Sequence, residues 1–239
     1  MRCDPWYDSR KAREPAPSTG PPVKSACGAG RGDAAMQVWV WSDYVCPWCF
    51  MMHASLQRVM ENRRLEVSWK AFELQPREHR PSPEELAAKE RMIQSTWPNV
   101  QRMAEEVYGL RLERPKLGVD TRLAHVAAKA AAELGQGDAY HHALFAAHWQ
   151  QGRDISDPAV LRALAEELGM DGEAFSEALE RQELLDAVMA EEAQAHQLGL
   201  TGVPAAVIAR RYLVSGARPA EQLEDIFRRI EQELGQAEG

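Results

Sequence analysis

The sequence predicts an α/β fold in which a mixed four-stranded sheet receives a large all-helical insertion. Two stretches with strand character, 37–42 and 65–72, stand early in the chain, and two more, 205–209 and 212–214, stand late. Between them, residues 83–199 follow an almost wholly helical pattern. A Cys-x-x-Cys directly follows the first strand, where an apolar helix begins, and this placement is typical of a redox-active dithiol.

The strands are recognised by their side chains and by their connections. Residues 37–42 are rich in aromatic and β-branched side chains, and residues 65–72 alternate apolar and polar positions. The first two strands are joined through a helix, which allows parallel pairing by a right-handed crossover. The last two are joined by a tight turn, which gives an antiparallel pair. The sheet is therefore expected to be mixed, with helices on both faces and a last amphipathic helix over residues 220–234.

The helical stretch contains its own start and stop signals. Ser82 precedes Pro83 and two glutamates, which is a typical helix start, and residues 156–158 again place a proline in a first turn. Glycines fall at plausible C-terminal stops. The predicted helices cover residues 83–108, 119–135, 138–151, 157–169, 171–181 and 183–199.

The chain divides into three parts. Residues 1–35 carry five prolines and show no helical or strand period, so they are predicted to be a disordered N-terminal extension. They also lack the apolar core of a secretory signal. Residues 36–82 and 200–239 are predicted to form the sheet-containing domain, and residues 83–199 are predicted to form the helical insertion domain.

Composition limits the partners. A net charge of −8 at pH 7 argues against a nucleic acid or an anionic membrane surface as the partner. No stretch approaches the roughly 18 apolar residues of a membrane span. Two of the four cysteines, Cys3 and Cys27, lie in the extension, so the chain has no disulfide framework of the secreted kind.

The Cys-x-x-Cys motif reads Cys46-Pro47-Trp48-Cys49. Two such cysteines can close a disulfide when their Cα atoms lie within about 4.4–6.8 Å, and the first turn of a helix achieves this. Cys46 is then expected at the N-cap of the helix. Pro47 follows at the first helical position, where its missing N–H costs nothing.

This placement assigns different chemistry to the two sulfurs. Unpaired N–H groups and the helix dipole stabilise an anion at the helix N-terminus, so a thiolate is favoured at Cys46. Cys46 is the expected nucleophile, and Cys49, one turn inside, is expected to be buried and to resolve a mixed disulfide. The alternatives are a structural disulfide and a zinc site. A structural disulfide here would close a very small loop and constrain the unfolded chain little. A zinc site needs two more ligands. We expect no cofactor beyond the Cys46–Cys49 disulfide and no metal.

A second tetrapeptide, Thr201-Gly202-Val203-Pro204, stands before the third predicted strand. A Val-Pro leading into a late strand is where a thioredoxin-like fold places a cis-proline beside its dithiol. The backbone of Val203 would then be free to bind an extended substrate peptide by strand-like hydrogen bonds. Pro204 is therefore a candidate catalytic residue, and Pro47, Trp48 and Val203 are candidate substrate-binding residues.

Together these motifs resemble the DsbA family of thioredoxin-like proteins, in its FrnE-like branch. The resemblance covers residues 37 to about 233 and rests on Trp41-Ser42-Asp43, Cys46-Pro47-Trp48-Cys49, Phe72-Glu73-Leu74-Gln75-Pro76, Gly152-Arg153-Asp154-Ile155-Ser156-Asp157, Thr201-Gly202-Val203-Pro204 and Val214-Ser215-Gly216-Ala217. It implies a cytoplasmic thiol–disulfide oxidoreductase that acts on disulfide- or thiol-containing proteins or small molecules. It also implies that Cys46 attacks, that Cys49 resolves and that Pro204 is cis.

A second function remains open. The glutathione-dependent 2-hydroxychromene-2-carboxylate isomerases and the kappa-class transferases share this fold and its helical insertion. They typically carry serine at the position of Cys46, because they activate the thiolate of glutathione and need no protein disulfide. The presence of both Cys46 and Cys49 favours disulfide exchange.

Weaker candidate sites lie elsewhere. His141 and His148 share one face of a predicted helix, but no carboxylate or third histidine is evident there, so packed or surface histidines are favoured over a metal site. Glu73 and Lys70, near the end of the second strand, could relay protons to Cys49. Charges at a strand end are more commonly solvated.

Overall fold

The computed structural model describes residues 35–79, 81–114 and 116–237. The predicted disordered extension, residues 1–35, lies outside the described residues except for Ala35, as do Cys3 and Cys27. Residues 35–239 form one unit. The predicted division of this unit at residues 82 and 199 stays a prediction.

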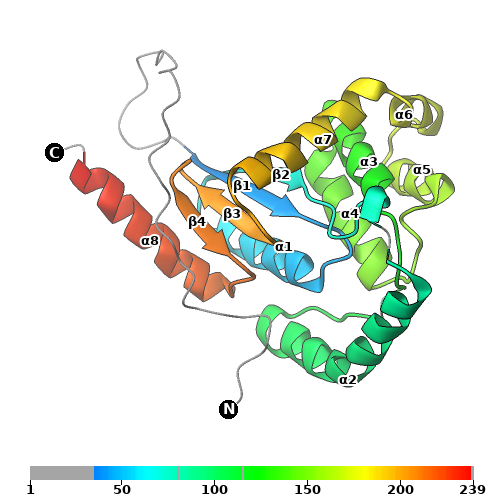
Figure 1. Cartoon of the computed structure of the whole chain (residues 1–239). Helices are drawn as coiled ribbons and strands as arrows, with labels where there is room; N and C mark the ends of the chain where they lie inside the picture. The colour runs from blue at the N-terminus through cyan, green and yellow to red at the C-terminus, as the bar shows by residue number, and fades with distance from the viewer. Residues whose placement is uncertain (1–34, 80, 115, 238–239) are drawn as a thin grey trace. The chain divides into compact units, whose positions relative to one another are not determined.

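A four-stranded mixed sheet forms the centre of the fold (Figure 1). The strands are β1 (Met36–Ser42), β2 (Leu65–Ala71), β3 (Ala205–Ile208) and β4 (Tyr212–Ser215), in the order β2-β1-β3-β4. β1 pairs in parallel with β2 and antiparallel with β3, and β3 pairs antiparallel with β4. The mixed sheet and the directions of the β1–β2 and β3–β4 pairs are as predicted, because the connections between these strands determine their directions. The pairing of β1 with β3 was not predicted.

The helices are also close to their predicted ranges. They are α1 (Pro47–Met60), α2 (Pro83–Tyr108), α3 (Arg122–Glu133), α4 (Gly137–Trp149), α5 (Pro158–Glu167), α6 (Gly172–Leu179), α7 (Gln182–Gln197) and α8 (Ala220–Ala237), with a short 3₁₀ helix at Arg77–His79 that the sequence did not predict. The Ser82 side chain accepts a hydrogen bond from the Glu85 backbone N–H, and the Glu85 carboxylate accepts one from the Ser82 N–H. This capping box explains the sharp start of α2.

Successive side chains of β1 point to opposite faces of the sheet, and each face packs against different helices. Val38 and Val40 are fully buried on the face covered by α1 and α8, in a cluster that includes Phe227. Trp41 points to the other face, where its indole N–H donates to the Glu191 carbonyl of α7 at 2.9 Å. Ser42 follows Val40 on the α1 side, and this parity directs its side chain toward the start of α1.

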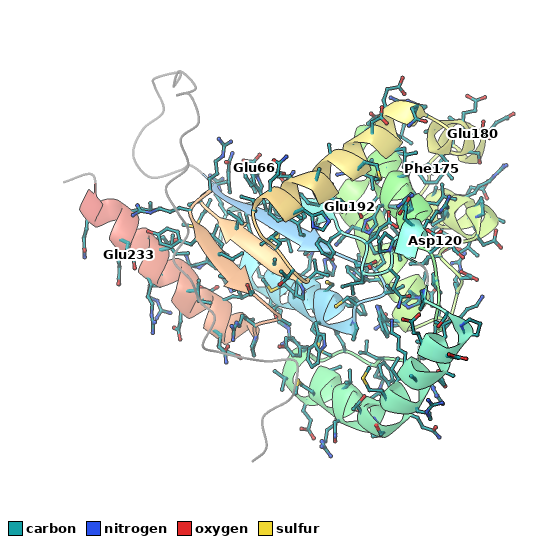
Figure 2. All side chains as sticks on the ribbon, viewed as in Figure 1. Glu66, Asp120, Phe175, Glu180, Glu192 and Glu233 are labelled. Carbon is teal, nitrogen blue, oxygen red and sulfur yellow. The ribbon has the colours of Figure 1, made fainter. Side chains whose placement is uncertain are left out.

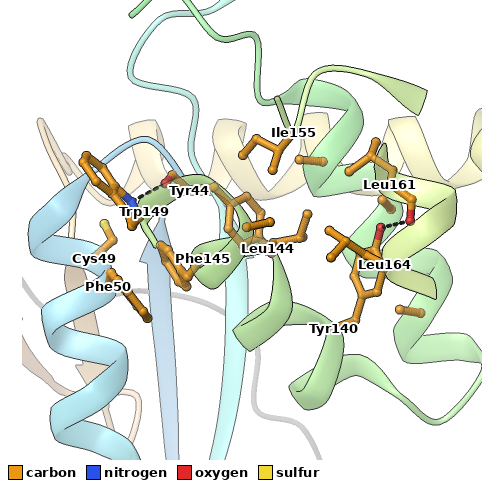
Figure 3. Packing of buried hydrophobic residues seen from close by; sticks show 14 of the residues in the cluster. Tyr44, Cys49, Phe50, Tyr140, Leu144, Phe145, Trp149, Ile155, Leu161 and Leu164 are labelled. Atoms are coloured by element: carbon orange, nitrogen blue, oxygen red, sulfur yellow. Dashed lines mark hydrogen bonds between the residues drawn. The ribbon is translucent and has the colours of Figure 1, made fainter. Parts of the chain in front are cut away.

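The helical stretch packs directly against the start of α1, as Figure 3 shows. The Phe50 ring of α1 stacks on the Phe145 ring of α4 with centroids 5.1 Å apart. The Trp149 indole N–H donates to the Tyr44 carbonyl at 2.8 Å, which ties α4 to the loop between β1 and α1. One cluster of buried side chains therefore runs from Cys46 and Cys49 through the helices. In the described residues, no helix is long and apolar enough to cross a membrane.

Histidines occupy part of this packing. His53 of α1 and His148 of α4 are buried, and burial lowers the pKa of His53 to about 3 and that of His148 to about 4. Burial also lowers the pKa of His141 well below its ordinary value. All three are therefore neutral in the folded protein near pH 7, whereas they titrate near pH 6.5 when the chain is unfolded.

Lowering the pH from 7 to 5 should destabilise the fold. The unfolded chain takes up protons that the buried histidines cannot, so stability is complete above about pH 6.5 and is lost as pH falls through that value. Each of His53 and His148 should remove about 2 kcal/mol from the free energy of unfolding over this range. Urea titrations at the two pH values measure the loss.

A matched pair of variants assigns the effect. His148→Leu should weaken the pH dependence, and His196→Gln, at an exposed position, is the matched control. Equal stability of the unmodified protein at pH 7 and pH 5 would contradict the burial of neutral histidines.

Candidate active site

Cys46 lies at the start of α1, as the sequence predicted. It is the N-cap residue with extended backbone angles (φ −99°, ψ 115°), and Pro47 occupies the first helical position. The Cys49 N–H donates to the Cys46 carbonyl at 3.1 Å, which closes the first turn. Cys46 and Cys49 are both thiols in this structure, and their side chains are close enough to interact.

Cys49 has the more buried sulfur and is completely inaccessible, while 4% of Cys46 is exposed. The Cys49 Sγ accepts a hydrogen bond from the Asp43 backbone N–H at 3.5 Å, and the Ser42 hydroxyl lies beside it. Burial raises the pKa of the Cys49 thiol well above its ordinary value, and the neighbouring Cys46 raises it further. Cys49 is therefore a protonated thiol when both cysteines are reduced.

The second predicted part of the site lies against the first. The Val203–Pro204 peptide bond is cis, and Pro204 is buried. The Cys46 Sγ lies 3.6 Å from the Val203 carbonyl oxygen, to which the thiol can donate. Pro47, Trp48 and Val203 are each partly exposed beside this contact. The structure thus brings all six residues that the sequence singled out to one place.

A buried carboxylate that the sequence analysis did not single out holds the loop before Cys46. The Asp43 side chain is fully buried and accepts hydrogen bonds from the backbone N–H groups of Leu74, at 2.7 Å, and Val45, at 3.4 Å. The Asp43 carbonyl accepts from the Cys46 N–H at 3.1 Å. His125 Nε2 of α3 lies 3.8 Å from the Asp43 Oδ1. Only the Trp-Ser-Asp motif itself could have drawn attention to this residue.

A lysine on α2 is a further residue that sequence reasoning missed. Lys89 is half-buried, and burial lowers the pKa of its ammonium group, whereas the charges of Asp43 and Cys46 oppose that shift. It lies on the same side of α2 as Ile93 and Trp97, which pack against the cluster containing Cys46. Lys89 therefore supplies positive charge to the surroundings of the dithiol.

Glu73 and Lys70 do not reach Cys49. The Glu73 carboxylate accepts a hydrogen bond from the Arg122 Nε at 2.6 Å, and its backbone N–H donates to Glu192 of α7 at 2.8 Å (Glu192 is labelled in Figure 2). The Lys70 Nζ pairs with the Glu191 carboxylate at 3.4 Å. Ion pairs with residues of α3 and α7 hold both side chains, so the favoured interpretation of solvated strand-end charges is wrong, and neither ion pair supports the less favoured proton relay to Cys49.

Two of the three histidines of α4, His141 and His148, are packing residues. The Tyr44 hydroxyl and the His141 Nδ1 share a hydrogen bond of 2.9 Å, and the His148 ring packs edge-on against Trp149. Among the described residues, no group of three or more potential ligands is placed to hold a metal ion.

Comparison with known proteins places the chain in a family. A family model described as the DSBA-like thioredoxin domain matches residues 37–228. The chain belongs to this family. A curated relative, the uncharacterised protein YwbO of Bacillus subtilis (strain 168), is 33% identical over 177 residues, which are 72% of this chain and 86% of the relative.

Solved structures show the same fold. A probable DsbA oxidoreductase from Streptomyces coelicolor is 31% identical, with a TM-score of 0.73 over 83% of this chain and 91% of that one. A 2-hydroxychromene-2-carboxylate isomerase is 21% identical, with a TM-score of 0.67 over 84% of this chain and 99% of that one. Because oxidoreductase and isomerase share the architecture, the fold alone does not choose between them.

Replacing Asp43 by asparagine should destabilise the protein by about 1–3 kcal/mol, because one of the two buried backbone donors then faces an NH₂ group instead of an oxygen. Urea unfolding measures the loss. Asp138→Asn is the matched control, since Asp138 is exposed and should change stability little. An Asp43→Asn protein as stable as the control would show that the carboxylate does not hold the loop.

Proposed function

We propose that this protein is a thiol–disulfide oxidoreductase that exchanges disulfides with protein or small-molecule substrates through Cys46 and Cys49. The observation that carries the proposal is the Cys46 Sγ at the helix start, 3.6 Å from the Val203 carbonyl, with Cys49 fully buried one turn inside. Family membership supports it, because thiol chemistry is the common activity implied by a DsbA-like domain.

The proposed cycle uses the two cysteines in order. The Cys46 thiolate attacks one sulfur of a substrate disulfide, which forms a mixed disulfide and releases the first substrate thiolate. Cys49 loses its proton and attacks the Cys46 sulfur. The Cys46–Cys49 disulfide forms, and the second substrate sulfur leaves as a thiolate. The protein is oxidised by two electrons and the substrate disulfide is reduced, and the reverse direction oxidises a substrate dithiol.

The different environments of the two sulfurs support these roles. Cys46 keeps slight exposure, stands at the positive end of the α1 dipole and interacts electrostatically with the Lys89 ammonium. Cys49 is fully buried one turn inside α1. In the proposed cycle it therefore reacts only with the mixed disulfide that Cys46 forms. Pro47 and Trp48 follow Cys46 in the first turn of α1, and the Val203 carbonyl lies 3.6 Å from the Cys46 Sγ. These three residues are the proposed contacts for substrate, with Pro204 as the proposed cis-proline of the site.

Membership of the FrnE-like branch and a cytoplasmic location belong to the same proposal. Both follow from the sequence motifs that span residues 37 to about 233. In this proposal the dithiol itself is the redox group, without a further cofactor.

The alternative is a glutathione-dependent isomerase or transferase. This alternative stays open because the fold also resembles that of a 2-hydroxychromene-2-carboxylate isomerase. In that case glutathione would supply the thiolate, and the pair Cys46 and Cys49 would be dispensable. Disulfide exchange is the better-supported function because Cys46 takes the place at which those enzymes typically carry serine.

Cys46→Ser should abolish reduction of insulin disulfides, whereas Cys49→Ser should trap a mixed disulfide with substrate, because the resolving sulfur is gone. Turbidity of reduced insulin measures the first result, and mass spectrometry of the trapped protein measures the second. Cys27→Ser is the control and should keep full activity.

Full insulin reduction by Cys46→Ser would overturn the assignment. Turnover of an electrophile with glutathione by a protein lacking both cysteines would instead establish the isomerase or transferase alternative.

A further inference from the structure

One edge of the central sheet is uncovered. β4 is the last strand in the order β2-β1-β3-β4, and no strand of the described residues pairs with its outer side (Figure 1). The other edge strand, β2, is closed at its end by α7, where Glu191 accepts a hydrogen bond from the Ala71 N–H and Glu192 accepts one from the Glu73 N–H. An unpaired edge is a template for a further extended chain, so its side chains indicate which chain it accepts.

The register of the sheet shows which backbone groups of β4 point outward. The Gly216 N–H donates to the Pro204 carbonyl at 2.8 Å, and the residues bonded in this way alternate along an antiparallel ladder. The intervening residues, Leu213 and Ser215, therefore direct their N–H and C=O groups away from the sheet. The Ser215 carbonyl accepts a hydrogen bond from the Arg218 Nη2 at 3.2 Å, and the Leu213 side chain is 48% exposed. The edge thus presents backbone donors and acceptors around an apolar side chain.

This edge is positively charged although the protein is acidic. Residues 205–219 contain three arginines and no acidic residue, whereas the whole chain carries a net charge of −8. Arg210 and Arg211 are exposed directly before β4, and Arg218 follows its end. The acidic side chains of α8, such as Glu233 in Figure 2, belong to the helix that packs on the face of the sheet opposite α7. Both ends of β4 are therefore marked by positive charge.

The turn before β4 fixes one of these arginines in place. Arg210 has a φ of 57°, which residues other than glycine rarely adopt. Its Nε donates to the Gln37 Oε1 at 3.0 Å, and its guanidinium lies 5.3 Å from the centroid of the Trp39 ring. The registers place Trp39, Val207 and Leu213 in one row across the sheet. Arg210 is thus held beside this row by uncharged side chains, which leave its positive charge available to a partner.

We propose that the free edge of β4 binds an acidic, extended segment of another protein, which adds a strand to the sheet. The outward N–H and C=O groups of Leu213 and Ser215 form the new ladder. Acidic side chains at the two ends of the segment pair with the arginines at the two ends of β4, and this charge complementarity selects the partner. A β-branched or apolar side chain at its centre lies against Leu213.

A second copy of the chain fits this edge less well. In an antiparallel pair of β4 strands centred on Val214, Arg210 of one copy stands opposite Arg218 of the other, and such like charges oppose pairing. Binding at this edge requires no reaction of Cys46 or Cys49, so the inference is independent of the proposed function.

Fluorescence anisotropy with a labelled synthetic peptide measures the binding to the full chain. The probe has two glutamates at each end of a Val-Thr-Val centre. One control peptide has lysines in place of the glutamates, and another has proline in place of the central threonine, which removes a ladder donor. The probe should bind, its affinity should fall about tenfold when NaCl is raised from about 50 mM to about 500 mM, and neither control peptide should bind.

Two pairs of variants separate charge from strand pairing. Arg211→Glu should weaken binding of the probe at least about tenfold, while Arg91→Glu, at an exposed arginine of α2, should leave it unchanged. Leu213→Pro removes an outward N–H without removing a bond between β3 and β4, and Leu213→Ala is its control, because it also loses the leucine side chain but keeps the N–H. The proline variant should bind about 3- to 10-fold more weakly than the alanine variant.

A dissociation constant above about 1 mM for the unmodified protein would overturn the proposal. Equal affinities of Arg211→Glu and Arg91→Glu would overturn the acidic partner, and equal affinities of the two Leu213 variants would overturn strand addition. A dimer in sedimentation that Leu213→Pro abolishes would show that a second copy occupies the edge instead. Arg211→Glu should still reduce dithiobis(nitrobenzoate) at the unmodified rate, so that loss of peptide binding is distinguished from loss of thiol–disulfide exchange.

Discussion

The buried Asp43 carboxylate fixes the geometry on which the candidate site depends. Its two oxygens accept backbone N–H groups from the loop before α1 and from the chain leaving β2. Its own backbone donates to the Cys49 sulfur and accepts from the Cys46 N–H. A carboxylate buried at this depth is stable only when it is hydrogen-bonded or paired, and the same contacts that stabilise it position both cysteines. Loss of any one of them would move the sulfurs relative to each other.

Helices far along the sequence supply further contacts to the loop before α1. Trp149 of α4 donates to the Tyr44 carbonyl, and His125 of α3 lies 3.8 Å from the Asp43 carboxylate. The Lys89 ammonium of α2 interacts electrostatically with Asp43 and Cys46. Each of these residues is more than forty positions from the motif that it serves. The sheet and α1 alone would provide a dithiol at a helix start, and the helices provide the charges and the packing around it.

This division also explains what the sequence could predict. The strands, the pairing directions, the helix ranges and the place of Cys46 follow from local patterns, because a helix start or a strand is specified by a few adjacent residues. The His125–Asp43 contact and the place of Lys89 depend on which helix faces of a long insertion meet the loop after β1, and no local pattern specifies that. The ion pairs of Glu73 and Lys70 were missed for the same reason, since Arg122 and Glu191, their partners, come from α3 and α7.

The two cysteines have identical side chains, so only their surroundings can give them different chemical roles. Cys46 stands at a helix N-terminus and interacts electrostatically with the Lys89 ammonium, and both favour attack on an external disulfide. Cys49 has the opposite setting, because burial raises its pKa well above the ordinary value. Below that pKa, each unit by which the pKa is raised lowers the fraction of Cys49 present as thiolate about tenfold. The proton of the buried Cys49 thiol must therefore be removed before this sulfur can attack the Cys46 sulfur and resolve the mixed disulfide.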